Sequence, residues 1–239
     1  MLTGIKSLAP DGFFRLTGKL FVFFLEILAS GVELEVKGRE KLPRSAYLLC
    51  PNHNGNLDVV FIRRVMGSDF FRNKRCSALG RLGPRISPFV RRMWLSLGIH
   101  LIVDERRNIR ALREALRSLR EGNSLILFPE RKNGVAYRGA AYLACESSRP
   151  VVPVRIAGGG FLERKPPPYA WPLAVRREYI RRGGRVTVTI MDPIVPDPER
   201  YRRGGKRYLD ELTQELGEKL GVLRSQAVPV RTISSGDGG

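Results

Sequence analysis

Short apolar runs alternate along this chain with longer segments in which apolar residues recur every three or four positions. The short runs are typical of strands, and they cover residues 47–50, 125–128 and 151–156. Residues 32–36, in which apolar and charged side chains alternate, and residues 186–190 are also expected to be strands. The longer segments predict helices over residues 13–30, 58–66, 107–121, 138–147 and 206–220. Because strands alternate with helices, we expect an α/β fold: a mixed, mostly parallel sheet flanked by helices, with an N-terminal amphipathic helical segment.

Turn-forming residues refine this outline. Gly122 follows the helix predicted over 107–121 and is expected to end it. Pro153 lies in a predicted strand, and because proline has no N–H to donate, we expect either an edge strand or the start of a strand. We predict three parts, which are a membrane-associating helix over residues 1–31, one domain over 32–224 and a disordered tail over 225–239.

The first predicted helix is amphipathic and rich in aromatic residues. The apolar residues near one of its faces are Phe13, Phe14, Leu16, Leu20, Phe23, Phe24 and Ile27. Lys19 and Glu26 interrupt the apolar run, which is therefore too short to span a membrane. The apolar face either lies in the plane of a membrane surface or packs on the protein's own core. We expect the protein to associate with the cytoplasmic face of a membrane.

The chain is strongly basic. Lys and Arg total 42 against 23 acidic residues, which gives a formal net charge of +19. Such a surface attracts anionic membranes, acidic substrates or nucleic acid. No nucleic-acid-reading motif is present and the basic residues are not gathered in one arm, so nucleic acid is not an expected partner. The three cysteines match neither a disulfide framework nor a metal site, which indicates reduced thiols in the cytosol.

The first candidate for catalysis follows the strand predicted over 47–50. A turn-forming Asn-Gly-Asn tripeptide separates His53 from Asp58, so His53 would end the strand while Asp58 lies in the first turn of the next helix. The helix dipole favours an aspartate there, and its carboxylate can accept a hydrogen bond from the imidazole. Such a pair can remove a proton from a hydroxyl group. The alternative is that Asp58 only caps the helix and His53 is a structural turn residue.

A second cluster of charged residues follows the strand predicted over 125–128, and its members are Glu130, Arg131 and Lys132. The two cations, together with Arg138, suit a phosphate, and Glu130 would orient them or hold an acceptor hydroxyl. Arg106 follows another apolar stretch, in which His100 is expected to be a strand residue, and would converge on the same pocket. Ligands of α/β folds bind beyond the carboxyl ends of strands, where both motifs are expected. The alternative for the second cluster is a solvated charged turn.

With both motifs in place, the chain resembles the glycerolipid acyltransferases, specifically the 1-acylglycerol-3-phosphate O-acyltransferase (lysophosphatidic acid acyltransferase) family. The family's Asn-His-x-x-x-x-Asp motif is matched by Asn52, His53 and Asp58. The first half of its Phe-Pro-Glu-Gly-Thr-Arg-Ser motif is matched by Phe128, Pro129 and Glu130. A later apolar strand with a proline is matched by residues 151–154, and the motifs occur in the family's order over roughly residues 13–195.

The resemblance implies a reaction without an acyl-enzyme. His53, oriented by Asp58, would take the proton of the acceptor hydroxyl, which attacks an acyl thioester of coenzyme A or acyl carrier protein. The implied partners are a lysophospholipid acceptor, this acyl donor and an anionic membrane surface. No metal or other cofactor is implied.

Two departures from the family pattern concern the part of the site that is expected to bind the headgroup of the acceptor. Where the family has Gly-Thr-Arg, this chain has Arg131, Lys132 and Asn133. The family's second motif is matched only loosely, by Gly98, Ile102, Asp104 and Arg106. Three interpretations stay open: acyl transfer to 1-acylglycerol-3-phosphate, making phosphatidic acid in phospholipid biosynthesis; transfer to another lyso-lipid; or non-enzymatic binding of anionic lipid.

Overall fold

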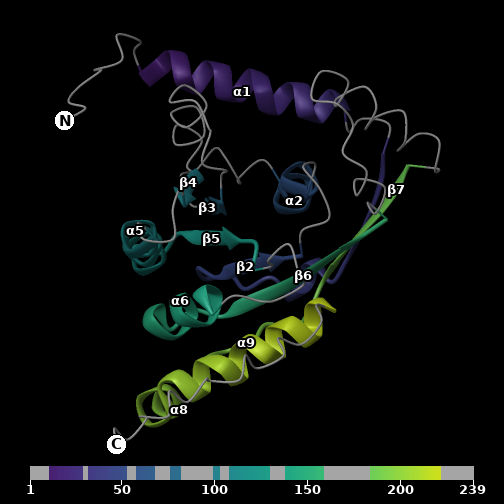
Figure 1. The fold of residues 1–239 in the computed structure, drawn as a ribbon. Coiled ribbons are helices and arrows are strands. Elements are labelled where there is room, and N and C mark those ends of the chain that lie inside the picture. Colours follow the sequence, from purple (N-terminus) through teal and green to yellow (C-terminus); the bar gives the residue numbers. More distant parts are fainter. Residues whose placement is uncertain are drawn as a thin grey trace, which may run out of the picture.

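The computed structural model describes residues 11–28, 32–52, 58–67, 76–81, 99–102, 108–129, 138–158 and 184–221. The described strands form one seven-stranded sheet with the order β1-β7-β6-β2-β5-β3-β4 (Figure 1). They are β1 (Glu33–Lys37), β2 (Leu48–Pro51), β3 (Cys76–Arg81), β4 (Ile99–Ile102), β5 (Ser124–Leu127), β6 (Val151–Ala157) and β7 (Arg185–Ile190). The helices are α1 (Asp11–Leu28), the short 3-10 helix η1 (Arg39–Lys41), α2 (Asp58–Met66), α5 (Asn108–Arg120), α6 (Gly139–Ser147), α8 (Pro198–Gly204) and α9 (Lys206–Leu220).

The strands of this sheet run in two directions. β1 and β7 pair in parallel, whereas β7 and β6 pair in the antiparallel sense. The pairs β6–β2, β2–β5, β5–β3 and β3–β4 are all parallel. The expected mixed, mostly parallel sheet flanked by helices is therefore confirmed. The strands β6, β2, β5, β3 and β4 all end at the same edge of the sheet.

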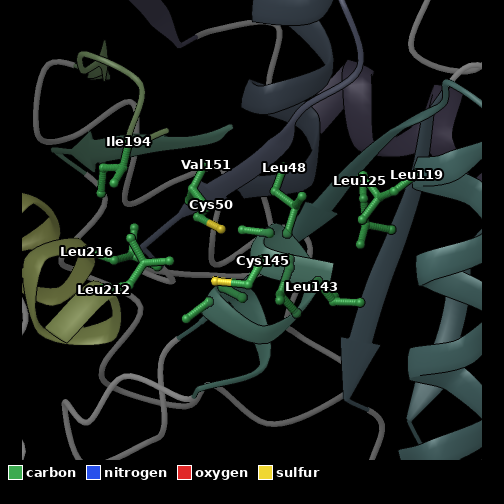
Figure 2. Close-up of a cluster of buried hydrophobic side chains, with 14 of the residues drawn as sticks. Leu48, Cys50, Leu119, Leu125, Leu143, Cys145, Val151, Ile194, Leu212 and Leu216 are labelled. Carbon is green, nitrogen blue, oxygen red and sulfur yellow. The ribbon is translucent and has the colours of Figure 1, made fainter. Parts of the chain in front are cut away.

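Apolar side chains fill two layers, one on each face of the sheet. Alternate residues of a strand point to opposite faces. In β2, Leu49 packs in the layer formed with α2, whereas Leu48 and Cys50 pack in the layer formed with α5, α6 and α9. Figure 2 shows this second layer, where Leu48 and Cys50 are joined by helix residues such as Leu143 and Leu216. The central strands are thus covered on both faces, which explains why their sequences are mostly apolar.

Most predicted elements are present, with ends that differ by at most two residues. The helices predicted over 58–66 and 206–220 have the bounds of α2 and α9, and His100 lies in β4 as expected. We did not predict β3, η1 or α8. The six residues of β3 show neither an apolar run nor an alternation, and this segment is a strand because β5 and β4 pair with it on both sides.

Pro153 lies neither in an edge strand nor at the start of a strand, so our expectation for it was wrong. It is the third residue of β6, which lies between β7 and β2. The Val154 carbonyl accepts a hydrogen bond from Asn52 on the β2 side, whereas the Pro153 carbonyl accepts one from Met191 on the β7 side. The missing N–H of Pro153 therefore faces Met191, one residue past the end of β7. The proline removes one donor only, and pairing with the same segment continues on both sides of it, at Val154–Ile190 and at Val151–Ile194.

Helix α1 is attached to the domain through α2. The Glu26 carboxylate accepts hydrogen bonds from Arg63 Nη1 at 3.3 Å and from Arg64 Nε at 2.9 Å. A third bond joins Arg64 Nη2 to the Glu26 carbonyl. Both arginines lie in the last turn of α2, where the helix dipole favours cations. Charged side chains thus fix α1 to the helix that begins with Asp58.

The apolar face of α1 is exposed. Phe13, Leu16, Leu20, Phe23 and Ile27 recur every three or four residues, and their exposed fractions lie between 45% and 62%. These five side chains do not pack on the protein's own core, and the N-terminal amphipathic segment is confirmed. The side chains of Phe14 and Phe24, which the same interpretation included, lie outside the described ones. Within the described residues, no helix combines the length and the hydropathy that crossing a membrane requires.

Replacement of Gly38 tests how closely β1 approaches β7. Gly38 has a φ of +77°, and an added Cβ would lie 2.2 Å from the Ile190 carbonyl oxygen. Gly122 has a φ of +87°, but a Cβ there would meet nothing within 4 Å. We expect Gly122→Ala to lower the free energy of unfolding by about 1–2 kcal/mol, the cost of left-handed backbone. Gly38→Ala should lower it more, because Ile190 belongs to the sheet. Urea denaturation measures both values, and equal losses would contradict this prediction.

Candidate active site

The two sequence motifs leave the same edge of the sheet. β2 and β5 are parallel neighbours in which Leu49 pairs with Ile126. The segments that follow them therefore begin side by side, one with Asn52 and the other with Phe128. β4 ends at this edge as well, two strands away from β5. Ligands of such sheets bind beyond the carboxyl ends of the strands, so the topology supports one shared site.

Five of the six predicted site residues lie outside the described residues, and they are His53, Arg106, Glu130, Arg131 and Lys132. Their roles therefore stay predictions. The sixth, Asp58, is the first residue of α2 and is only 2% exposed. The positive end of the helix dipole favours a carboxylate in this position.

Two buried polar residues mark the site. Among the side chains whose burial the structure describes, the only polar or charged ones that are buried belong to Asn52 and Asp58. They flank residues 53–57, the segment that contains the predicted base His53. Burial of a polar group is unfavourable unless it is hydrogen-bonded or paired. A buried polar side chain at each end of the same short segment therefore indicates a functional constraint on that segment.

The side chain of Asn52 is bound to the backbone of β6. Its Nδ2 donates to the Ile156 carbonyl at 3.1 Å, and its Oδ1 accepts from the Ile156 N–H at 2.6 Å. Ile156 is 1% exposed, so water cannot replace these bonds. Each polar group of this kind that loses its partner costs about 1–3 kcal/mol. In the sequence Asn52 stands out only as part of a motif, because no neighbouring residue identifies Ile156 as its partner.

The two residues of the second motif that precede Glu130 pack against the rest of the domain. Phe128 packs against the apolar layer that includes α2, and Pro129 is buried. Asp58 begins α2, so the described parts of the two motifs meet the same face of the sheet. The chain that carries Glu130 is therefore held in place at its start.

Arg138 has a different partner from the one expected. Its guanidinium binds the Asp210 carboxylate of α9 through two nitrogens, with 2.9 Å between Nη2 and Oδ2. Both side chains are about half exposed. The charge of Arg138 is thus matched by a carboxylate in the contact between α6 and α9, and we no longer count it among the phosphate-binding residues.

Two thiols are buried in the layer shown in Figure 2. Cys50 and Cys145 are both free and buried among apolar side chains. Burial raises the pKa of the Cys50 thiol far above its ordinary value. Burial, with a smaller effect of the Glu146 charge, raises the pKa of Cys145 to about 11. Neither thiol forms the thiolate that a cysteine nucleophile needs at neutral pH. The described residues also contain no group of His, Cys, Asp and Glu that could hold a metal ion.

Thiol labelling tests this burial. We expect Cys50 and Cys145 to remain unreactive toward 5,5′-dithiobis(2-nitrobenzoic acid) at pH 8 in the folded protein, because the reagent requires a thiolate. A Cys76→Ser background leaves only these two thiols. Both should react once urea unfolds the chain. A fast reaction of either thiol in the folded protein would show that the apolar layer opens readily.

The comparisons with known proteins agree with this fold. The model of the Acyltransferase family matches residues 33–157, from β1 to β6. The chain belongs to this family, which confirms the resemblance seen in the motifs. It is 27% identical over 206 residues to a probable 1-acyl-sn-glycerol-3-phosphate acyltransferase of Mycoplasma pneumoniae, covering 80% of this chain and 72% of that protein.

A solved structure has a similar fold. It is the crystal structure of the 1-acyl-sn-glycerophosphate acyltransferase PlsC from Thermotoga maritima, with a TM-score of 0.51 and 21% sequence identity. The similarity covers 90% of this chain and 81% of that one. At this level of identity, the comparison supports the arrangement of helices and strands.

Proposed function

We propose that this protein transfers a fatty acyl group from a thioester donor to the free hydroxyl of a lysophospholipid such as 1-acylglycerol-3-phosphate, which makes phosphatidic acid for phospholipid biosynthesis. The observation that carries the proposal is the burial of Asp58 at the start of α2, five residues after His53 in the segment that follows β2. The family match and the name of the Mycoplasma relative support the same reaction and acceptor class.

His53 is the general base of the proposed mechanism. Its imidazole, held in one tautomer by a hydrogen bond to Asp58, takes the proton of the acceptor hydroxyl as the oxygen attacks the thioester carbonyl carbon. The tetrahedral intermediate then loses the thiolate as the carbon–sulfur bond breaks, and the imidazolium gives its proton to that thiolate. The donor is an acyl-coenzyme A or an acylated carrier protein. No covalent bond to the enzyme forms, which agrees with the buried, protonated thiols of Cys50 and Cys145.

Charged residues beside the base would bind the acceptor. Glu130, Arg131 and Lys132 follow β5, the direct neighbour of β2, and Arg106 follows β4 at the same edge. Guanidinium and ammonium groups bind the phosphate oxygens of the headgroup, and Glu130 orients these cations. Because Arg131, Lys132 and Asn133 stand where the family has Gly-Thr-Arg, another lyso-lipid acceptor is the second candidate.

Replacement of His53 tests the proposed reaction. We expect His53→Ala to lower kcat by about 10²–10⁴-fold, the usual contribution of a general base. His100→Ala, which removes the only other histidine, should leave kcat nearly unchanged. The assay is acylation of a panel of lysophospholipids by the purified protein with acyl-coenzyme A, after circular dichroism has shown that each variant is folded. Full activity of His53→Ala would exclude the proposed base. Lipid binding without acylation of any acceptor would favour a non-enzymatic binder of anionic lipid.

The exposed face of α1 is proposed to lie on the cytoplasmic face of an anionic membrane. Leu16, Leu20 and Phe23 would enter the headgroup region, while Lys19, which is also exposed, would bind lipid phosphates. The net charge of +19 favours the same surface. Because Glu26 fixes α1 to α2, a helix lying on the membrane would keep the catalytic edge at a constant distance from its lipid substrates.

A pair of matched variants tests this placement. We expect Phe23→Asp to weaken binding to vesicles of mixed phosphatidylcholine and phosphatidylglycerol by about tenfold or more, because burying a Phe side chain contributes about 1.5–3 kcal/mol. Val195→Asp makes the same change of charge at an apolar residue that is 72% exposed and outside α1, and it should weaken binding much less. Co-sedimentation measures both affinities. Equal effects would show that net charge, and not the face of α1, determines binding.

A further inference from the structure

Asn52 occupies the point at which the chain leaves the sheet. Its backbone N–H still belongs to the ladder between β2 and β6, because it donates to the Val154 carbonyl at 3.1 Å. The pairs Leu48–Val151 and Cys50–Pro153 fix the register of this parallel ladder. In a parallel ladder with this register, the next bond would join the Ile156 N–H to the backbone carbonyl of Asn52. The bond after that would join the Ile156 carbonyl to the N–H of residue 54.

The side chain of Asn52 makes both of those bonds. Its Oδ1 accepts from the Ile156 N–H at 2.6 Å, in place of its own backbone carbonyl. Its Nδ2 donates to the Ile156 carbonyl at 3.1 Å, in place of the N–H of residue 54. A primary amide carries one acceptor and one donor side by side, as a peptide group does. One side chain therefore completes the edge of β6 without any further residue of the β2 strand.

This substitution has a consequence for the following residues. The buried polar groups of Ile156 no longer require the backbone of residues 53 and 54 to continue along β6. Residues 53–57 are thus bounded by two buried polar residues, Asn52, which is hydrogen-bonded to β6, and Asp58, which lies in the first turn of α2.

We propose that Asn52 is a positioning residue for acyl transfer: its amide ends the ladder between β2 and β6 and thereby sets where His53 stands relative to Asp58. The catalytic meaning of this role rests on the proposed function. A purely structural role would require only that Ile156 keep its partners. A positioning role also requires that the amide lie at the distance from the backbone that asparagine gives it.

Asn52→Gln separates these two roles. Glutamine keeps the donor and the acceptor but places them one methylene further from the backbone, so Ile156 can stay bonded while the departure point of the chain moves. We expect the variant to fold, with kcat lowered by about 10²-fold, as for a misplacement of about 1 Å, and with KM little changed. Asn123→Gln makes the same change in the segment before β5, at the opposite edge of the sheet, and should leave both constants unchanged.

A spectroscopic measurement reports on His53 without any assay of activity. The chain has only two histidines, so the ring nitrogens of ¹⁵N-histidine-labelled protein give separate signals for His53 and His100. A hydrogen bond to Asp58 selects one tautomer of His53. We expect Asn52→Gln to shift the His53 ring signals toward the average of the two tautomers, while the His100 signals remain in place.

The outcomes separate this proposal from the proposed function. A folded Asn52→Gln protein with unchanged kcat, or with unchanged His53 ring signals, would overturn the positioning role while leaving acyl transfer intact. A protein that acylates no lysophospholipid, but whose His53 ring still responds to Asn52→Gln, would retain the positioning role and lose the proposed function. If circular dichroism shows that Asn52→Gln does not fold, Asn52→Ser carries the same measurements, because its hydroxyl both donates and accepts without added volume.

Discussion

The burial of β2 between β6 and β5 is the constraint on which the rest of the structure depends. All four of its residues are buried, and their side chains enter the apolar layers on both faces of the sheet. Removal of apolar surface from water is the main favourable contribution to folding. A strand with apolar neighbours on every side cannot shift its register without exposing some of them. The position of its last residue, and hence the start of the candidate site, is therefore fixed.

Polar groups define where this apolar region ends. Asn52 and Asp58 are buried beside it, and each is stabilised there in a different way. The amide of Asn52 satisfies the backbone of β6, whereas the carboxylate of Asp58 lies at the positive end of α2. The proposed base, His53, belongs to the short segment between these two residues, within the part of the chain that the family model matches. Helix α1 follows the opposite arrangement, because its apolar face is exposed and its carboxylate at Glu26 is bound to α2.

Local sequence patterns were sufficient to predict the helices and strands whose own residues show which side is buried. The apolar stripe and turn residues predicted α2, α5 and α9 closely, and short apolar or alternating runs predicted β1, β2, β5, β6 and β7. The order of elements, with strands alternating with helices, led to the mixed, mostly parallel sheet. For the site, the motifs identified Asp58 at the first turn of a helix and placed both clusters after parallel strands. These features follow from the spacing of residues along the chain, which is why the sequence alone predicts them.

Other features depend on partners that are distant in the sequence. β3 is a strand because β4 and β5 flank it, and Pro153 is accommodated within the sheet because pairing continues on both sides of the one donor that it lacks. Arg138 was expected to bind phosphate but is paired with Asp210 across α6 and α9. Asn52 and Ile156 are 104 residues apart, and only the register of β2 against β6 brings them together. The sequence by itself thus determined the elements, the class of fold and the chemistry of the motifs. The tertiary structure alone decided which groups satisfy each buried donor and acceptor, because hydrogen bonds are directional and short.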